Sequence, residues 1–255
     1  MKDIEFSVKS IGEIAPNIYS ITLVSTEKLP PMRCGQFLHL EVKDDALPLR
    51  RPFCLYKFDE QSVTLIVAVV GKGTKKICAM KVGERVKAIL PIGNGFTPKE
   101  EHKKIALIGG GVGCAPLYAL KQCYPDKEYM AFLGYSSKKN IILYDDFKKE
   151  YKTVLSTDDG SAGEKGYVTD AFKRHISEFM PDVILTCGSE NMLKAVAKVS
   201  KELSIPAYMS GENRMACGVG ACLVCTCAVR QPDGSVKNMR SCVDGPVFDM
   251  KDLEF

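Results

Sequence analysis

The sequence KIALIGGGVGCAP, residues 104–116, decides the fold of the central part of the chain. An apolar run of strand length leads directly into glycines, and the pattern predicts a helix from about Pro116. Such a turn can bind phosphate, because glycines let the backbone approach an anion and a helix N-terminus attracts it. The candidate residues are Gly109, Gly111 and Gly113. Their spacing differs from the G-x-G-x-x-G dinucleotide fingerprint, so a tight turn without a ligand is the alternative.

The alternation of strand and helix continues beyond this turn. Strands are expected at residues 129–133, 153–156 and 183–186, and helices at 144–150, 168–178 and 191–203. This order predicts a parallel sheet with helices on both faces. The fold class of this part is therefore α/β.

The preceding segment has a different character. β-Branched and alternating side chains, separated by turn residues, occur at residues 6–8, 18–24, 36–42, 63–70 and 85–90. Several short strands of this kind predict a small antiparallel β-barrel, interrupted by one short helix at 74–80. The polar stretch 97–104 is the expected junction with the α/β part.

Two features of the barrel segment suggest an anion site. Arg51 precedes an aromatic residue, Phe53, while Gly73 and Thr74 stand at the start of the expected helix. A guanidinium and a helix start could together bind a pyrophosphate, with Phe53 near a flat ring. Each feature has an ordinary alternative. Arg50 and Arg51 could be a solvated pair on the surface, and the glycine–threonine segment could be a turn with an N-cap.

The chain has 11 cysteines, and five of them lie between residues 217 and 242. An odd number argues against complete disulfide pairing. Four of the five follow the plant-type ferredoxin spacing C-x4-C-x2-C…C, which supplies the thiolates of a [2Fe–2S] cluster. The predicted ligands are Cys217, Cys222, Cys225 and Cys242.

Small residues between the first two of these cysteines support the cluster. Gly218 and Gly220 let backbone N–H groups approach the sulfides, which tunes the potential. A zinc site and inert thiols are the alternatives, but zinc ribbons prefer two C-x2-C pairs and this segment has one. The fifth cysteine, Cys227, is expected to be a buried thiol beside the cluster and not a ligand.

Composition excludes several classes of function. A formal net charge of +4, without a concentrated run of Lys or Arg, does not indicate a nucleic-acid surface. The apolar run at 63–70 is far too short for a membrane span. The charged N-terminal residues lack the apolar core of a secretory signal, so a cytoplasmic protein is expected.

The order of barrel, glycine-turn α/β part and cysteine motif resembles the ferredoxin-reductase superfamily. Within it, the chain resembles the electron-transfer subunits of class B dihydroorotate dehydrogenase over nearly its whole length. The most specific matches are PIGNGF, TDDGS, GYVT and MACGVGAC, at residues 91–96, 157–161, 166–169 and 215–222. The resemblance implies an FAD-binding barrel at 1–98, an NAD-binding α/β domain at 99–209 and a [2Fe–2S] domain at 210–255.

The resemblance also implies cofactor-binding residues. The family's first flavin motif falls on Arg51, Pro52, Phe53 and Cys54, where Cys54 replaces the usual serine, a better hydrogen-bond donor. A second element falls on Ile66, Val67 and Ala68, without the aromatic and arginine often found there, so that backbone contacts are expected. The third falls on Gly73 and Thr74. The nicotinamide would lie by Cys187 and Gly188, although Ser189-Glu190 departs from the usual Gly-Pro.

The implied activity is an electron relay in pyrimidine biosynthesis. A partner subunit oxidises dihydroorotate on FMN, and electrons pass through the cluster and FAD to NAD+. The implied assembly is a heterotetramer with two copies of each subunit.

Two alternative functions stay open. One is the small subunit of an NADH-dependent ferredoxin:NADP oxidoreductase or a sulfide dehydrogenase, relatives in which Asp often replaces one cluster cysteine. The other is a non-catalytic iron–sulfur sensor or scaffold.

Overall fold

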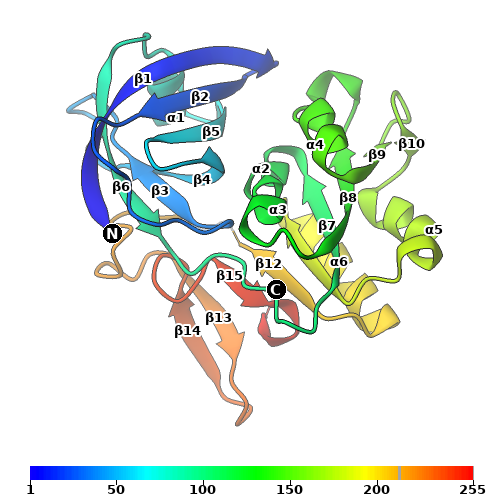
Figure 1. Cartoon of the computed structure of the whole chain (residues 1–255). Coiled ribbons are helices and arrows are strands. Elements are labelled where there is room, and N and C mark those ends of the chain that lie inside the picture. Colours follow the sequence, from blue (N-terminus) through cyan, green and yellow to red (C-terminus); the bar gives the residue numbers. More distant parts are fainter. Residues whose placement is uncertain (212–213, 255) are drawn as a thin grey trace.

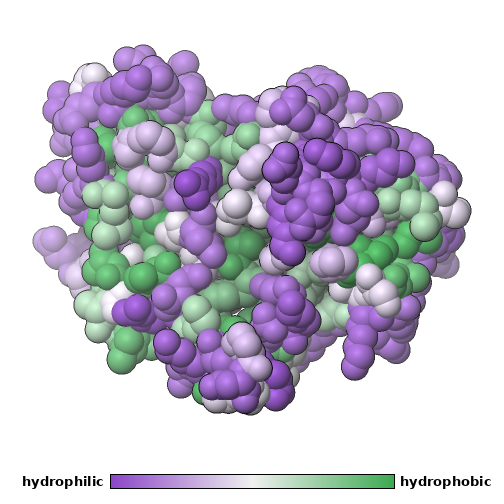
Figure 2. All heavy atoms as spheres, turned by 60° about the horizontal axis from the view of Figure 1, so that its bottom comes forward, coloured by the Kyte–Doolittle hydropathy of each residue, from purple (hydrophilic) through white to green (hydrophobic). Residues whose placement is uncertain are grey.

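The computed structural model describes residues 1–211 and 214–254. Figure 1 shows the barrel beside the α/β part, with the C-terminal segment beneath both of them. Figure 2 brings that lower side forward and shows hydrophobic atoms recessed between lobes whose outer surfaces are mostly hydrophilic. Among the described helices, none is long and apolar enough to cross a membrane.

Six antiparallel strands close the barrel in the order β1-β2-β5-β4-β3-β6. They are β1 (Lys2–Ala15), β2 (Ile18–Val24), β3 (Phe37–Leu40), β4 (Arg51–Phe58), β5 (Ser62–Ala68) and β6 (Arg85–Ile92), and one short helix, α1 (Lys72–Cys78), follows β5. The predicted strands are all present. The structure adds β4, a segment whose sequence was interpreted only as a ligand motif. Alternate side chains of β3 face opposite sides: Leu38 and Leu40 fill the barrel core, and Phe37 and His39 point away from it.

The α/β part is a seven-stranded sheet in the order β10-β9-β8-β7-β11-β12-β15. Its strands are β7 (Lys104–Gly110), β8 (Glu128–Tyr135), β9 (Lys152–Thr157), β10 (Glu164–Lys165), β11 (Val183–Cys187), β12 (Ala207–Ser210) and β15 (Val247–Asp249). All neighbours are parallel except β12 and β15, which are antiparallel. The predicted parallel sheet is confirmed, and its last strand comes from the C-terminal segment.

Helices cover both faces of this sheet because successive residues of its buried strands point to opposite sides. On one face, Leu107 packs in a core with Leu117 and Phe147, and on the other Ile108 packs with Phe172 and Val196. The covering helices are α2 (Ala115–Tyr118), α3 (Leu120–Cys123), α4 (Tyr144–Glu150), α5 (Val168–Phe179) and α6 (Glu190–Leu203).

The helix predicted from about Pro116 is present as α2, which begins at Ala115 and ends at Tyr118. A 3-10 turn over Gly111–Cys114 precedes α2, and α3 is a separate short piece. The left-handed conformation of Gly111, with φ of +55°, begins this irregular path. The 3-10 turn, α2 and α3 are thus three short helical pieces of four residues each, and they do not form one regular helix.

The C-terminal segment connects the other two parts. Its loop from residue 214 leads into the hairpin β13 (Thr226–Arg230) and β14 (Val236–Arg240), and the chain then returns to the sheet as β15. Asn94, just after the barrel, donates to the Val247 carbonyl at 2.9 Å and accepts from the Val247 N–H at 3.1 Å. This segment is thus hydrogen-bonded both to the sheet edge and to the residues that follow β6.

Candidate functional site

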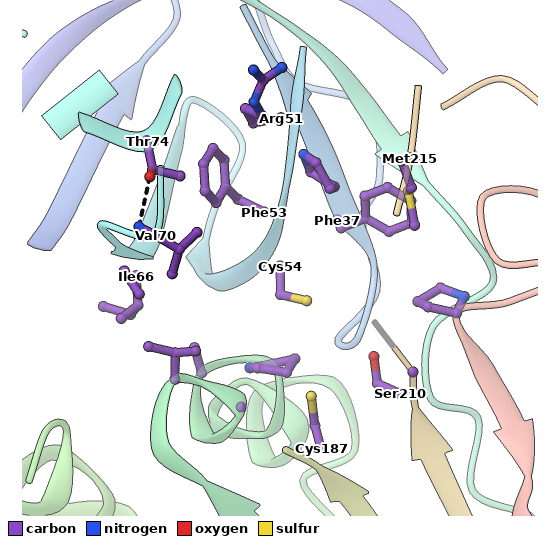
Figure 3. A pocket seen from close by; sticks show the side chains of 18 residues that line it. Phe37, Arg51, Phe53, Cys54, Ile66, Val70, Thr74, Cys187, Ser210 and Met215 are labelled. Atoms are coloured by element: carbon purple, nitrogen blue, oxygen red, sulfur yellow. Dashed lines mark hydrogen bonds between the residues drawn. The ribbon is translucent and has the colours of Figure 1, made fainter. Parts of the chain in front are cut away.

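A cavity of about 290 Å³ lies between the barrel, the glycine turn and the C-terminal segment. Figure 3 shows side chains from all three parts pointing into it. Seven of its lining residues are those assigned to the flavin motifs: Arg51, Pro52, Phe53, Cys54, Ile66, Ala68 and Thr74. The structure therefore brings together residues that are up to 23 positions apart in the sequence.

Arg51 and the start of α1 form the polar end of this cavity. A β-carbon built on Gly73 would lie 2.6 Å from the Arg51 Nε atom, so the absence of a side chain there makes room for the guanidinium. The hydroxyl of Thr74 accepts the N–H groups of Val70 at 2.9 Å and Gly71 at 3.1 Å, as Figure 3 shows for Val70. The guanidinium thus lies beside this turn, as the predicted pyrophosphate site would require, and that site stays a prediction.

Val67 does not line the cavity. It is fully buried in the barrel core, because alternate residues of β5 face opposite sides of the strand and Ile66 and Ala68 face the cavity. A contact of Val67 with a ligand could only come from its backbone.

The glycine turn contributes to two neighbouring cavities. Gly113 and Cys187 line the first. A second cavity, of about 610 Å³, is lined by Gly110, Gly111 and a group of side chains, among them Tyr135, Ser136, Asn140, Asp158 and Asn191. Of these, Asp158 belongs to the TDDGS match, whereas Tyr135, Asn140 and Asn191 were not singled out as site residues. The predicted phosphate-binding turn thus separates a cavity beside the barrel from one over the ends of β8 and β9.

Close backbone packing accounts for the other glycines of this region. A β-carbon on Gly113 would lie 2.5 Å from the Cys187 carbonyl oxygen. Gly109 and Gly188 line neither cavity; they lie against the Cys114 and Met192 side chains, respectively. These positions keep the turn and the end of β11 in contact.

The loop that begins at Cys217 curls around its own first sulfur. Gly218 and Gly220 have φ of +69° and +84°, a conformation that favours glycine. The Cys217 Sγ atom accepts the N–H groups of Val219 and Cys222, each at 3.4 Å. These bonds, the one from Val219 foremost, lower the pKa of the Cys217 thiol to about 6, which favours the thiolate that an iron site requires.

The later two cysteines of the motif lie together beneath the barrel. The Sγ atoms of Cys225 and Cys242 are 3.3 Å apart, and both residues are buried. Burial raises the pKa of the Cys242 thiol to about 12. Both pack in one apolar cluster with Phe37, which also lines the first cavity. Phe37 thus forms a shared wall between the cavity and the cysteine motif.

Cys227 lies on β13, and its Sγ atom donates to the Met239 carbonyl oxygen at 3.6 Å. Burial raises the pKa of its thiol. That it is not a ligand stays a prediction.

Sequence reasoning missed several lining residues of the first cavity: Phe37, Val70, Ser210, Gly211, Met215 and Pro246. Three of them, Gly211, Met215 and Pro246, come from the segment around the cysteine motif. Met215 begins the MACGVGAC match, but no local pattern assigns any of the three to a cavity beside the barrel, because that placement depends on how the C-terminal segment packs against the other two parts.

His39 was also missed. Its side chain is fully buried on the outer face of β3, and a β-carbon on Gly218 would lie 2.6 Å from its Nδ1 atom. Burial, together with the charges of Arg50 and Arg51, lowers the pKa of His39 to about 4. The imidazole is therefore neutral at pH 7.

Comparison with known proteins agrees with this architecture. Residues 212–254 match the model of the iron–sulfur cluster binding domain of dihydroorotate dehydrogenase B, and residues 107–198 match that of the oxidoreductase NAD-binding domain. A structure described as the NADH-dependent reduced ferredoxin-NADP oxidoreductase superposes with a TM-score of 0.85 at 28% identity, over 98% of this chain and 89% of that one.

Curated relatives extend the match along the sequence. The dihydroorotate dehydrogenase B (NAD(+)) electron transfer subunit of Clostridium acetobutylicum is 36% identical, over 96% of this chain and 95% of the relative. The corresponding subunit of Caldanaerobacter subterraneus subsp. tengcongensis is 38% identical, over 97% of each chain. The chain therefore belongs to the family of dihydroorotate dehydrogenase B (NAD(+)) electron transfer subunits.

Proposed function

We propose that this chain carries electrons from an FMN-containing dihydroorotate dehydrogenase subunit to NAD+ in the cytoplasm. In this proposal the cysteine motif holds a [2Fe–2S] cluster, and the cavity beside the barrel holds FAD. The observation that carries the proposal is the position of Phe37, which both lines the cavity and packs against Cys225 and Cys242. A cofactor in the cavity and one on the cysteines would therefore be separated by about one side chain.

The residues of the cysteine motif fit an iron–sulfur cluster. The motif supplies four thiols in two close pairs: the Cys222 N–H donates to the Cys217 Sγ atom at 3.4 Å, and the Sγ atoms of Cys225 and Cys242 are 3.3 Å apart. The loop also directs the Val219 N–H at the Cys217 sulfur. The proposed ligands are Cys217, Cys222, Cys225 and Cys242. Backbone N–H groups aimed at sulfur stabilise thiolates and raise the reduction potential of a bound cluster.

The barrel cavity fits a flavin with its phosphates. Arg51 would pair with the pyrophosphate beside Gly73 and Thr74, and Phe53, Cys54 and Ile66 would surround the ring system. When bound, FAD exchanges electrons singly or in pairs, and the cluster carries them singly. The protein's own part is to position these groups and exclude water.

The second cavity would hold NAD, with its phosphates at Gly110 and Gly111. Its nicotinamide would reach the first cavity past Gly113 and Cys187, which line that cavity on the side opposite the barrel. Hydride transfer requires the two rings to be in contact, and the glycine turn leaves the space for that approach.

The surface around the cysteine motif suits a protein partner. Val219, Leu223, Val224 and Val243 are 43%, 62%, 50% and 47% exposed. Large exposed apolar side chains around a redox centre are typical of a docking surface. We propose that this surface receives the FMN subunit, and that the complex contains two copies of each chain.

The test is co-purification with the FMN subunit, followed by a dihydroorotate:NAD+ assay. Cys225→Ser should abolish NAD+ reduction while the complex stays intact by size-exclusion chromatography. Cys227→Ser is the matched control and should retain the activity. Full activity of Cys225→Ser in an intact complex would overturn the proposal, and the mass of the complex tests the stoichiometry.

A further inference from the structure

His39 is a buried polar side chain whose ring has no hydrogen bond to any residue that the structure describes. It is 0% exposed, and neither ring nitrogen has a hydrogen-bond partner among the described residues. Leaving a buried donor unpaired costs stability, and an apolar residue of the same shape would avoid this cost. The described residues do not meet this need, so the imidazole calls for a further partner.

The surroundings of His39 indicate where that partner lies. Its neighbours across the sheet are Pro52 on β4 and Ile89 on β6, neither of which offers a side-chain acceptor. Outward from the barrel, its Nδ1 atom faces Gly218, the residue after Cys217, so closely that a β-carbon there would lie 2.6 Å away. The ring therefore points at the loop of the cysteine motif.

We propose that His39 is a positioning residue that donates a ring N–H to a sulfur of the [2Fe–2S] site. The inference rests on the proposed function, since it requires that the cysteine motif hold the cluster. An imidazole carries at least one N–H in either charge state, so a donor is always present. Reduction adds one electron and hence negative charge to the sulfurs, and a hydrogen bond strengthens as that charge grows.

Gly218 supports this role through its small size. A larger residue at this position would collide with the His39 ring, and φ of +69° already favours glycine. The loop therefore reaches the imidazole with backbone alone. This close approach places the ring beside the residue that follows Cys217, the first proposed ligand.

The first test is potentiometry of the cluster in the full chain under anaerobic conditions. His39→Phe keeps a ring but removes the donor, and His39→Asn restores an N–H near the Nδ1 position. We expect His39→Phe to lower the ratio of reduced to oxidised cluster about tenfold at a fixed potential, which equals about 59 mV for a one-electron couple. His39→Asn should recover at least half of this shift.

A matched control separates this effect from the general consequences of replacing a buried histidine. His102 is 6% exposed, and its Nδ1 atom accepts the Lys99 N–H at 3.3 Å, away from the cysteine motif. His102→Phe should leave the potential unchanged. Equal potentials in wild type and His39→Phe would overturn the inference.

A second measurement does not depend on the stability of any variant. Of the chain's 3 histidines, His39 faces the cysteine loop, whereas His102 lies beside Tyr208 and His175 contacts Glu164 and Glu178. In wild-type protein with isotopically labelled histidine, pulsed EPR of the reduced cluster should detect coupling to a histidine nitrogen. Absence of that coupling in cluster-loaded protein would overturn the role of His39 but leave the proposed function standing. Absence of any [2Fe–2S] signal would overturn the proposed function as well.

Discussion

The guanidinium of Arg51 lies directly against Gly73: a β-carbon built on residue 73 would stand 2.6 Å from the Arg51 Nε atom. The first residue of β4 and the first turn of α1 thus pack closely together at the polar end of the cavity. We expect Gly73→Ala to push the guanidinium out of place and weaken FAD binding at least about tenfold, or ~1.4 kcal/mol.

Flavin fluorescence titration measures this loss. Gly12→Ala is the control, because a β-carbon there meets nothing within 4 Å. FAD affinity of Gly73→Ala equal to that of Gly12→Ala would show that the contact does not position Arg51 for a ligand.

The barrel and the α/β part are joined by a hydrogen bond from the Tyr56 hydroxyl on β4 to Asp146 Oδ2 on α4, at 2.5 Å. Tyr56→Phe should lower the free energy of unfolding by about 1 to 2 kcal/mol, because the carboxylate loses a buried donor. Urea denaturation measures the difference. Tyr144→Phe, on the same helix, is the control, since no hydrogen bond of its hydroxyl occurs among the described residues. An equally large loss of unfolding free energy in Tyr144→Phe would show that the effect does not come from the hydrogen bond between Tyr56 and Asp146.

This junction should also weaken in acid. Burial by itself would raise the pKa of the Asp146 carboxyl, but hydrogen bonds from Tyr56 and Lys57 hold it below its usual value. A lowered pKa means that the contribution of Asp146 is complete well above the unfolded-state pKa of about 3.9 and is lost as the pH falls through the folded-state value. The stability difference between wild type and Asp146→Asn should therefore be constant from about pH 7 to 5 and shrink below about pH 4. A difference that grows in acid would contradict this assignment.

Asp158 lines the second cavity at the end of β9 and suits the discrimination of NAD from NADP. A carboxylate accepts hydrogen bonds from a ribose 2′-hydroxyl and repels a 2′-phosphate. Asp158→Asn should raise the ratio of NADPH to NADH activity about tenfold, measured as kcat/KM for flavin reduction. Asp159→Asn, which does not line the cavity, should leave the ratio near that of wild type. An equal rise of the NADPH-to-NADH ratio in both variants would show that Asp158 does not discriminate between the two cofactors.

Much of this architecture could be predicted because the deciding signals are local. The apolar run and glycines at 104–116 predicted a strand and its turn, and the helix at 144–150 has the bounds that its sequence indicated. Of the flavin-motif residues that line the cavity, Arg51, Phe53 and Thr74 were already indicated by local features, and the others were found by family resemblance. Their juxtaposition with Cys187 then follows from the packing of the barrel on the sheet.

What could not be predicted depends on contacts between distant segments. β15 has only three residues and exists because it pairs with β12, about 40 positions earlier. Pro52 within β4 obscured a strand, since proline is unusual inside a sheet. His39 looks like an ordinary polar residue in an alternating strand, and nothing in the sequence indicates that the loop of the cysteine motif packs Gly218 against its ring.

Anaerobic titration of the full chain with NADH tests the central claim most directly, with absorbance following the flavin and EPR following the cluster. Wild type and Cys227→Ser should contain FAD and iron, and NADH should bleach the flavin and produce the signal of a reduced [2Fe–2S] cluster. Cys225→Ser should show the flavin bleaching without that signal. Protein that contains iron but no FAD, or FAD that NADH does not reduce, would contradict the account.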